Sequence, residues 1–539
     1  MADTEANWEE IVRRKRQIRA DAIQEHSQHE SKASREHAVE TPFSPTSTQA
    51  ESERDFTDID HVEEITAAIQ SGEVTAARLC RAYIKRLTEI LFDEALNAAE
   101  ELDSYFRQHG TLVGPLHGVP MTLKDQFDVR GYDSTIGYVG RAFKPAGEDA
   151  VLVAMLKKLG AVVIAKTNLP QSIMWCETEN PLWGLTTHPE NPDFTPGGST
   201  GGESALLYMH GSVVGWGTDI GGSIRIPTHM MGLYGLKPSS TRLPYHGVPV
   251  STDGQEHVPS VVGPLSRSLQ SLTAVTKAVI DTSPWKLDPR CCPLPWRTDV
   301  FMEVQSRPLV IGLMEDDGVV RVHPPIARVL KAVAARLQEA GHEIIPWHPG
   351  NHHRECIDIV DAYYTADGGE DIRRDMLVGG EPYIPHVAGL VNKAPAVSVY
   401  EYWQLNKRKF AAQKRYLDKW NAAVSPKTGR TVDVLLTPVM PHSAVKHREC
   451  KWPGYTKVWN LLDYTALSLA AGAVSKELDP SMDSLSPYEA RNDIDKWNWS
   501  LYNPEAMDGM KVNVQIVGRK LEEEKVLGVA AVVEKLMNT

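Results

Sequence analysis

The sequence predicts an α/β protein, because helical segments alternate with short apolar segments that have the character of buried strands. The helical run AVLVAMLKKL ends at Gly160, and the apolar run AVVIAKTN follows it directly. A second helix, predicted over 324–341, lies between the strand-like runs PLVIGL and HEIIPW. With 539 residues, the chain has room for about three domains or for one large α/β domain built on an open sheet.

The elements in chain order begin with residues 1–56, which we interpret as an N-terminal helical and flexible extension. Residues 8–23 carry a loose helical stripe of apolar side chains, whereas the polar stretch that follows has almost no large apolar side chain. From residue 57 onward the pattern is that of a globular domain. Asp60 is a candidate cap for a first helix that Gly72 ends.

Two further helices are predicted over 76–86 and 92–106, and a turn rich in glycine and proline then leads into the strand-like segment MTLKDQFDV. Asp149 is a candidate cap for the helix that ends at Gly160. Residues 350–425 are mostly helical and polar, and we interpret them as a helical insertion or lid over the sheet. The runs VDVLLTPVMP and KVNVQIVG predict two late strands, and a helix ends the chain.

Charge and cysteine usage limit the class of function. The net charge of −13 argues against general nucleic-acid binding, which is typical of basic surfaces. Six scattered cysteines fit neither a disulfide scaffold nor a zinc ribbon, so we expect reduced thiols and a cytoplasmic location. We expect no secretory signal and no transmembrane segment, because the longest apolar runs, such as 526–533, are too short to span a bilayer. The histidines, including the pair 352–353, lack a metal-ligand spacing, so no metal is expected.

The most informative stretch is TPGGSTGGESALLYMHGSVVGWGTDIGGSIRIP, residues 195–227, in which glycines flank Ser199 and Ser223. Glycine at this density is typical of tight turns and of backbone that closely approaches a ligand. A helix-like run, ESALLYMH, and a strand-like run, SVVGWG, lie between the two serines. Both serines are therefore expected at the same end of a sheet. A pair of purely structural loops is the alternative interpretation.

The two serines suit acyl transfer, which needs a nucleophile, a base that takes its proton, and donors that stabilise the oxyanion. Ser223 has the better nucleophile context, because it follows a turn at the end of an apolar strand. Successive N–H groups from Ile220 to Ser223 are expected to form a nest that binds a developing oxyanion. Ser199 stands just before a helix, where a helix cap is the alternative role.

Lys124 is the candidate base, because it lies within an apolar strand-like segment where lysine is unusual. Burial without a carboxylate partner lowers the pKa of a lysine, so that its neutral amine can accept a proton. The alternatives are a surface lysine on an edge strand and a lysine paired with Asp125.

Other glycine-rich motifs do not fit this chain. It has no G-x-x-x-x-G-K-[ST] motif, and GWGTDIGG has the wrong glycine spacing for dinucleotide binding. Residues 197–201 match G-x-S-x-G, but the segment before them is not the buried strand that this motif requires. These glycines therefore do not predict a nucleotide site.

Several of these segments occur together in one family. GPLHGVPMTLKDQF, FTPGGSTGGESALL, GWGTDIGGSIRIP and VNVQIVGRKLEEEKVL stand in the order found in the amidase signature family. The chain resembles its fungal acetamidase-type members, notably through WCETENPLWGLTTHP at 175–189, and the resemblance covers about 57–539. It implies one large α/β domain, with a mixed central β-sheet flanked by α-helices, that hydrolyses a small-molecule amide without a metal or organic cofactor.

The resemblance also implies roles for single residues. Ser223 resembles the nucleophile that forms the acyl-enzyme, and Lys124 resembles the base of a Ser–Ser–Lys triad. Ser199 resembles the bridging serine, which in this family follows a cis peptide bond after the residue that corresponds to Gly198. The other implied site residues are the oxyanion and substrate-binding groups Ile220, Gly221, Gly222 and Ser199, and the supporting residues Thr200, Asp219 and Arg225.

The chain departs from the family pattern at two places. Thr200 stands where the family has the second serine of GGSSGG; it keeps the hydroxyl, so activity is expected to survive, although its restricted χ1 changes the local network. Near Arg86 the segment before LTEIL is shorter than in the family. This shortening motivates the alternative of a catalytically silent homologue that acts as a binding protein. A third hypothesis is an amidotransferase subunit that passes ammonia to a charged tRNA. The net negative charge of the chain argues against it.

The sequence fixes neither the substrate nor the oligomeric state. The segment that holds Trp175, Glu177, Leu182 and Trp183 is expected to line the substrate pocket. A monomer and a homodimer both remain open.

Overall fold

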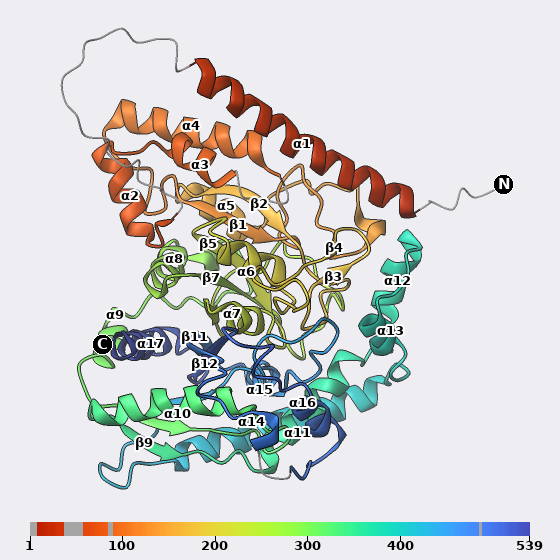
Figure 1. Ribbon diagram of the computed structural model, residues 1–539, viewed down its shortest axis with the longest axis vertical. Coiled ribbons are helices and arrows are strands. Elements are labelled where there is room, and N and C mark those ends of the chain that lie inside the picture. The colour runs from red at the N-terminus through yellow and green to blue at the C-terminus, as the bar shows by residue number, and fades with distance from the viewer. Residues whose placement is uncertain (1–7, 37–57, 85–89, 485–487, 539) are drawn as a thin grey trace, which may run out of the picture.

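The computed structural model describes residues 8–36, 58–84, 90–484 and 488–538. Its centre is a mixed sheet of ten strands, flanked by helices (Figure 1). This architecture confirms the predicted α/β class and the single large domain. In sheet order the strands are β2 Val162–Thr167, β1 Pro120–Lys124, β5 Val214–Asp219, β7 Val261–Ser266, β6 Tyr234–Lys237, β11 Ala466–Ala473, β12 Lys511–Val517, β10 Val434–Pro438, β8 Val310–Leu313 and β9 Glu343–Pro346.

The sheet is mixed because two parallel groups stand at its two ends. β1 is parallel to both β2 and β5, and β8 is parallel to both β9 and β10. The strands between these groups run antiparallel to their neighbours. A separate two-stranded ladder consists of β3 Glu179–Asn180 and β4 Gly184–Leu185.

Helices cover the sheet because β1, β2, β5 and β7 are buried along their whole length, which requires cover on both faces. The helices are α1 Trp8–Glu36, α2 Val62–Ser71, α3 Ala76–Ile84, α4 Phe92–His109, α5 Val151–Lys158, α6 Gly201–Tyr208, α7 Arg225–Met231, α8 Leu269–Asp281, α9 Thr298–Glu303, α10 Pro324–Glu339, α11 Asn351–Tyr364, α12 Glu370–Gly379, α13 Pro385–Val391, α14 Val399–Ala422, α15 Gly454–Leu461, α16 Asp493–Ser500 and α17 Glu523–Met537, with 3-10 turns η2 Val139–Arg141, η3 Pro284–Lys286 and η4 Met482–Ser484.

The apolar core divides into two large clusters along the sheet. One packs α2, α3, α4 and α5 against β1 and β2, and the other packs α10, α15 and α17 against β10, β11 and β12. β5 contributes to the first cluster, and α7 contributes to the second. The connection between β5 and α7, which carries Ser223, therefore leads from one cluster to the other.

Two predicted helix caps are wrong. α2 begins after His61, and Asp60 instead pairs with Arg267, whose Nε lies 2.5 Å from Asp60 Oδ1. α5 begins after Ala150, and Asp149 Oδ1 instead accepts the backbone N–H of Arg130 at 2.9 Å. The other oxygen of Asp149, Oδ2, pairs with Lys157 of α5 at 2.7 Å, so this carboxylate contacts the helix through a side chain and not through the N–H groups of its first turn. The contacts with Arg267 and Arg130 come from other parts of the chain and cannot be read from local spacing.

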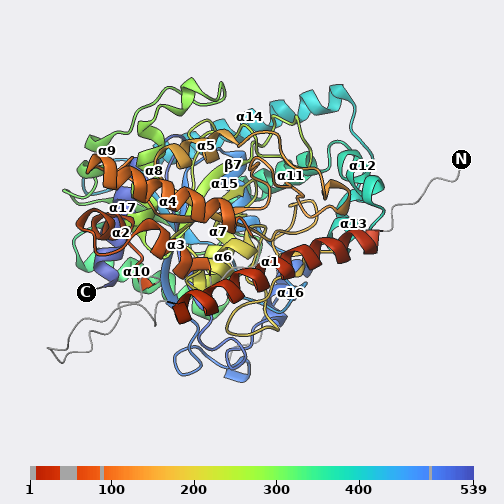
Figure 2. The same cartoon turned by 90° about the horizontal axis from the view of Figure 1, so that it is seen from above.

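The N-terminal helix α1 lies along one side of the body (Figure 2). Val12 belongs to an apolar cluster that also contains Val139 and Leu182. Arg16 Nε donates to the backbone carbonyl of Leu182 at 2.8 Å. The helical part of the predicted N-terminal extension is thus packed on the domain, whereas residues 37–56 and the shortened segment near Arg86 lie outside the described ranges.

The segment 350–425, predicted to be mostly helical, contains α11, α12, α13 and α14. In the chain this segment connects β9 to β10, two strands that lie on either side of β8 in the sheet. Its helices α11, α12, α13 and α14 lie at the end of the molecule away from α2, α3 and α4 (Figure 1). α11 packs against both α14 and α15. This arrangement brings the C-terminal end of α11 toward the loops that follow β5.

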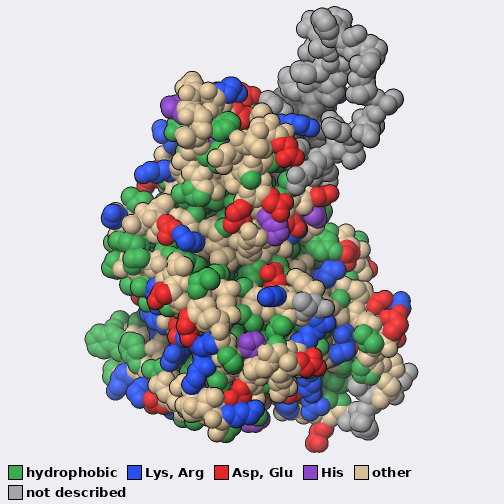
Figure 3. Space-filling view, turned by 90° about the vertical axis from the view of Figure 1, so that its left-hand side faces the viewer, with side chains coloured by type: hydrophobic (Ala, Val, Ile, Leu, Met, Phe, Trp, Pro, Cys, Tyr) green, Lys and Arg blue, Asp and Glu red, His purple; other side chains and the backbone are tan. Residues whose placement is uncertain are grey.

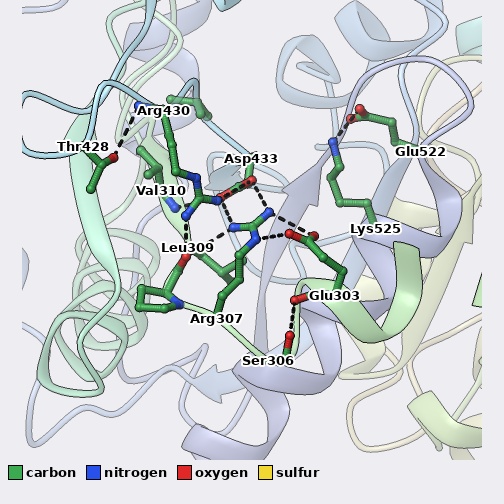
Figure 4. A network of polar contacts seen from close by, with 12 residues as sticks. Glu303, Ser306, Arg307, Leu309, Val310, Thr428, Arg430, Asp433, Glu522 and Lys525 are labelled. Carbon is green, nitrogen blue, oxygen red and sulfur yellow. Dashed lines mark hydrogen bonds and ion pairs between the residues drawn. The ribbon is translucent and has the colours of Figure 1, made fainter. Parts of the chain in front are cut away.

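A polar network fastens the start of β10 to the start of β8 (Figure 4). Asp433 accepts hydrogen bonds from Arg307 Nη2 at 2.9 Å and Nη1 at 3.0 Å, and from the backbone N–H of Val310 at 2.9 Å. Arg430 Nη2 lies 3.2 Å from the same carboxylate. Two arginines and one strand N–H therefore share a single aspartate where the parallel strands begin.

The surface shows no gathering of one charge on the face in Figure 3, where acidic and basic side chains are interspersed. Among the helices of the described residues, none is both long and apolar enough to cross a bilayer. No disulfide joins the six cysteines, all of which lie in described parts of the chain.

Candidate active site

The candidate catalytic residues meet at one edge of the sheet. Lys124 is the last residue of β1, and β5 ends at Asp219 beside it. Because β1 and β5 are parallel neighbours, their C-terminal ends lie together. Ser199 stands in the loop before α6, and Ser223 stands between β5 and α7. All of these side chains are buried, with Ser223 the most accessible of the triad candidates at 8% exposure.

Lys124 is a fully buried amine next to a serine. Its Nζ lies 2.6 Å from Ser199 Oγ and 3.0 Å from Thr218 Oγ1. Burial lowers the pKa of Lys124 to about 7, against the opposing charges of Asp219 and Asp125. At neutral pH a large fraction of the amine is therefore uncharged and able to accept a proton.

Both alternative interpretations of Lys124 are wrong. β1 lies between β2 and β5, so Lys124 is not on an edge strand. Among the described residues Lys124 forms no ion pair. The carboxylate of Asp125 instead accepts the backbone N–H of Ile136 at 2.7 Å and the hydroxyl of Thr135 at 3.0 Å.

Thr218 and Gln126 orient the lysine, although sequence reasoning missed both. The Thr218 hydroxyl donates to Gln126 Oε1 at 2.7 Å, so its own proton is engaged and its oxygen is left to accept from Lys124. A neutral amine that donates to Thr218 keeps its lone pair for the hydroxyl of Ser199. A polar threonine in the apolar strand β5 is the sequence feature that could have pointed to this role.

Ser199 faces the lysine rather than capping a helix. The peptide bond between Gly198 and Ser199 is cis, as the family resemblance implies. Gly198 lies against the backbone of Glu177, and a Cβ at this position would come within 2.4 Å of the Glu177 carbonyl oxygen, so only glycine fits. The next residue, Thr200, donates its backbone N–H to the carbonyl of Ser223 at 3.2 Å. This bond ties the loop of Ser199 to the loop of Ser223.

The loop before Ser223 presents backbone donors, but not all of the predicted ones. The N–H of Gly222 donates to Asp219 Oδ1 at 2.9 Å and is therefore engaged within the loop. Within the described chain, the N–H groups of Ile220, Gly221 and Ser223 make no hydrogen bond. These three groups remain as candidate donors to an oxyanion.

Asp219 holds this loop through a buried ion pair. Its carboxylate lies 2.8 Å from Arg225 Nη2, and both side chains are inaccessible to solvent. Burial alone would raise the pKa of Asp219, but the charge and hydrogen bonds of Arg225 outweigh it and lower the pKa to about 2. Arg225 also donates to Gln515 and Asn460, residues from distant strands and helices that sequence reasoning could not associate with the site.

Comparison with known proteins identifies the family. A sequence profile described as Amidase matches residues 74–527. The chain belongs to the amidase signature family. It is 54% identical over 532 residues to "Amidase 1" of Gibberella moniliformis, across 98% of this chain and 99% of that relative. It is 37% identical to the "Acetamidase" of Emericella nidulans, across 98% of each chain.

Solved structures agree with this assignment. The chain is similar to "Fatty acid amide hydrolase", with a TM-score of 0.88 and 30% identity over 99% of this chain and 95% of that chain. The resemblance drawn from the sequence is thereby confirmed. As a member of this family, the chain is an amide-hydrolysing enzyme.

The residues predicted to line the substrate pocket of this amidase lie in three different environments. Glu177 accepts the backbone N–H groups of Arg448 and Cys450 at 2.6 and 2.8 Å, and burial raises its pKa to about 7. Leu182, which is buried, and Trp183, which is half-buried, instead pack in the apolar cluster that contains Val12 of α1. The remaining residue of the predicted wall, Trp175, stacks on His386 with ring centroids 4.3 Å apart.

A hollow of about 1260 Å³ lies beside α14, lined in part by Tyr245, Ser260 and Phe410. Lys124, Ser199 and Ser223 are not part of its lining. We therefore do not assign it as the substrate pocket of the amidase. Among the described residues, no group of three or more histidine, cysteine, aspartate or glutamate side chains is placed to hold a metal ion.

Thr200, the position at which the chain departs from the family pattern, fits because β5 has a glycine opposite it. A Cβ on Gly217 would come within 2.6 Å of Thr200 Cγ2 and 2.9 Å of Thr200 Oγ1. The extra methyl group of threonine therefore occupies the space above this glycine. The missing side chain at Gly217 of β5 therefore leaves room for the side chain of Thr200.

We predict that Gly217→Ala lowers the stability of the amidase by about 1–3 kcal/mol, because its methyl group overpacks against Thr200. Thr200→Ser removes Cγ2, the closer of the two clashing atoms, so the double variant should recover part of the loss. Thermal unfolding of the four proteins in this double-mutant cycle measures the coupling. Strictly additive changes in the melting temperature would show that contact between the added methyl group and Thr200 does not cause the loss of stability.

Proposed function

We propose that this amidase hydrolyses a small carboxylic acid amide to the acid and ammonia or an amine through a Ser–Ser–Lys triad. The supporting observation is the 2.6 Å contact between Lys124 Nζ and Ser199 Oγ. It lies in a buried setting that lowers the pKa of Lys124 to about 7. A neutral lysine beside a serine is the arrangement needed to start a proton relay.

In the first proposed step, neutral Lys124 accepts the hydroxyl proton of Ser199, and Ser199 takes the hydroxyl proton of Ser223. The Ser223 oxygen then forms a bond to the amide carbon, and the carbonyl electron pair moves onto the carbonyl oxygen. The N–H groups of Ile220, Gly221 and Ser223 stabilise the resulting oxyanion.

The proton returns along the same route in the second proposed step. Protonated Lys124 passes it through Ser199 to the amide nitrogen, whose bond to carbon breaks, and ammonia or an amine leaves. The acyl group stays on Ser223. Water then adds to the acyl carbon and gives its proton to the relay, and the carboxylic acid leaves as Ser223 regains its hydroxyl proton.

A small amide is the proposed substrate class because two relatives named "Acetamidase" are 37% and 38% identical to this chain. The name of the structural neighbour "Fatty acid amide hydrolase" refers to a longer acyl chain in that protein. The cytoplasmic location and the choice between monomer and homodimer stay predictions.

Ser223→Ala should abolish acyl-enzyme formation. We expect turnover to fall at least about a thousandfold, and labelling by a fluorophosphonate probe to disappear. Ser204→Ala is the matched control, since Ser204 is a buried serine of the same glycine-rich stretch whose hydroxyl donates to the Gly201 carbonyl at 3.1 Å. This control should keep both labelling and turnover. A folded wild-type protein without labelling or hydrolysis would instead favour the catalytically silent alternative.

The pH profile should report the protonation state of Lys124. Its pKa is lowered to about 7, and only the neutral amine accepts a proton. We therefore expect kcat/KM to fall below about pH 7 and to reach a plateau above it.

Lys237 is the matched control for this assignment, because burial also lowers its pKa, to about 8. Lys237→Met should leave the acid limb of the profile where it is, even if it reduces the amount of folded enzyme. Lys124→Met should remove turnover altogether. An acid limb that moves in Lys237→Met, or a flat profile between pH 5 and 9, would contradict the role of Lys124.

A further inference from the structure

One tyrosine connects the helical segment between β9 and β10 to the loop before Ser223. Tyr364, at the C-terminal end of α11, donates its hydroxyl to the backbone carbonyl of Ile220 at 2.6 Å. The next carbonyl, that of Gly221, accepts the hydroxyl of Thr456 at 2.7 Å. Two hydroxyls from distant parts of the chain therefore hold two successive peptide groups of this loop.

Holding a carbonyl also fixes the N–H of the same peptide group. The peptide between Ile220 and Gly221 is trans and planar, so the Gly221 N–H points opposite to the Ile220 carbonyl. Since Tyr364 holds that carbonyl, the Gly221 N–H is turned away from α11. Within the described chain this N–H makes no hydrogen bond, which leaves it available to a ligand.

The contact between Tyr364 and this loop is close enough to fix the loop. A Cβ on Gly221 would come within 2.7 Å of the Tyr364 hydroxyl oxygen, so the tyrosine hydroxyl packs against this glycine and leaves no room for a side chain there. Burial, with the charges of Asp361 and Asp219, raises the pKa of Tyr364 well above its ordinary value. The hydroxyl thus stays protonated and keeps donating. A donor on the carbonyl also polarises the peptide and strengthens its N–H as a donor.

We propose that Tyr364 is a positioning residue of the oxyanion hole, which orients the Gly221 N–H toward the oxyanion by holding the Ile220 carbonyl. α11 therefore completes the active site from outside the glycine-rich stretch. This inference rests on the proposed function. A purely structural tyrosine, which only anchors the end of α11, is the competing explanation.

Tyr364→Phe removes the hydroxyl and keeps the ring. We expect kcat to fall about tenfold, less than the roughly 100-fold or greater loss on removing an oxyanion donor outright, while KM changes less than about twofold. A trifluoromethyl ketone, which forms a tetrahedral adduct with a serine nucleophile, should bind more weakly by about the same factor as kcat falls. If Tyr364 had only a structural role, the loss in kcat and the loss in affinity for the ketone would not match.

Tyr363→Phe is the matched control. Tyr363 is the preceding residue of α11, and its hydroxyl donates to Asn406 Oδ1 at 2.6 Å, away from the loop. This variant removes the same chemical group from the same helix and should leave kcat and affinity for the ketone within about twofold of wild type. Unchanged values in Tyr364→Phe, or equal losses in both variants, would overturn the inference.

The same probe separates this inference from the proposed function. If Ser223 is not a nucleophile, wild-type enzyme will not form the ketone adduct. If the adduct forms in wild type and equally well in Tyr364→Phe, the triad stands and only the role of Tyr364 fails.

Discussion

The active site depends on the burial of one amine without a counter-ion. Asp219 and Asp125 are the two carboxylates whose charge acts on Lys124, but each has other partners. Asp219 pairs with Arg225, and Asp125 accepts hydrogen bonds from the Ile136 N–H and the Thr135 hydroxyl. Desolvation therefore dominates and lowers the pKa of Lys124 to about 7. A single carboxylate paired with this amine would restore its charge and remove its capacity as a base.

The fold creates this environment by placing β1 between two parallel strands. β2 and β5 pair with both edges of β1, which places β1 inside the sheet, and α3 and α6 pack against it, so that all of its residues, Lys124 included, are buried. The parallel pairing of β1 and β5 brings Thr218 and the loop of Ser223 to the same end of the sheet. Around this point, glycines are required where other backbone approaches, as at Gly198 beside Glu177. The pairing of β1 with β2 and β5 thus both builds this part of the sheet and positions the catalytic side chains at its end.

Much of this arrangement was predictable from the sequence. Alternation of helices with buried strands gave the α/β class, and a lysine in an apolar segment together with two glycine-flanked serines indicated the candidate triad. The helix caps at Asp60 and Asp149 were not predictable, because these carboxylates have partners elsewhere in the chain. Nor could periodicity show that α1 covers Leu182, or that Tyr364 reaches a loop about 140 residues earlier, since only tertiary packing makes these contacts.

The most direct test of the central claim is a titration of the Lys124 amine itself. NMR of protein with lysine labelled at Cε can follow each amine through the pH range, and the resonance missing in Lys124→Met assigns the one that matters. We predict a midpoint near pH 7. A midpoint close to the ordinary lysine value of about 10.4 would mean that the amine is charged at neutral pH, which would contradict its role as the base.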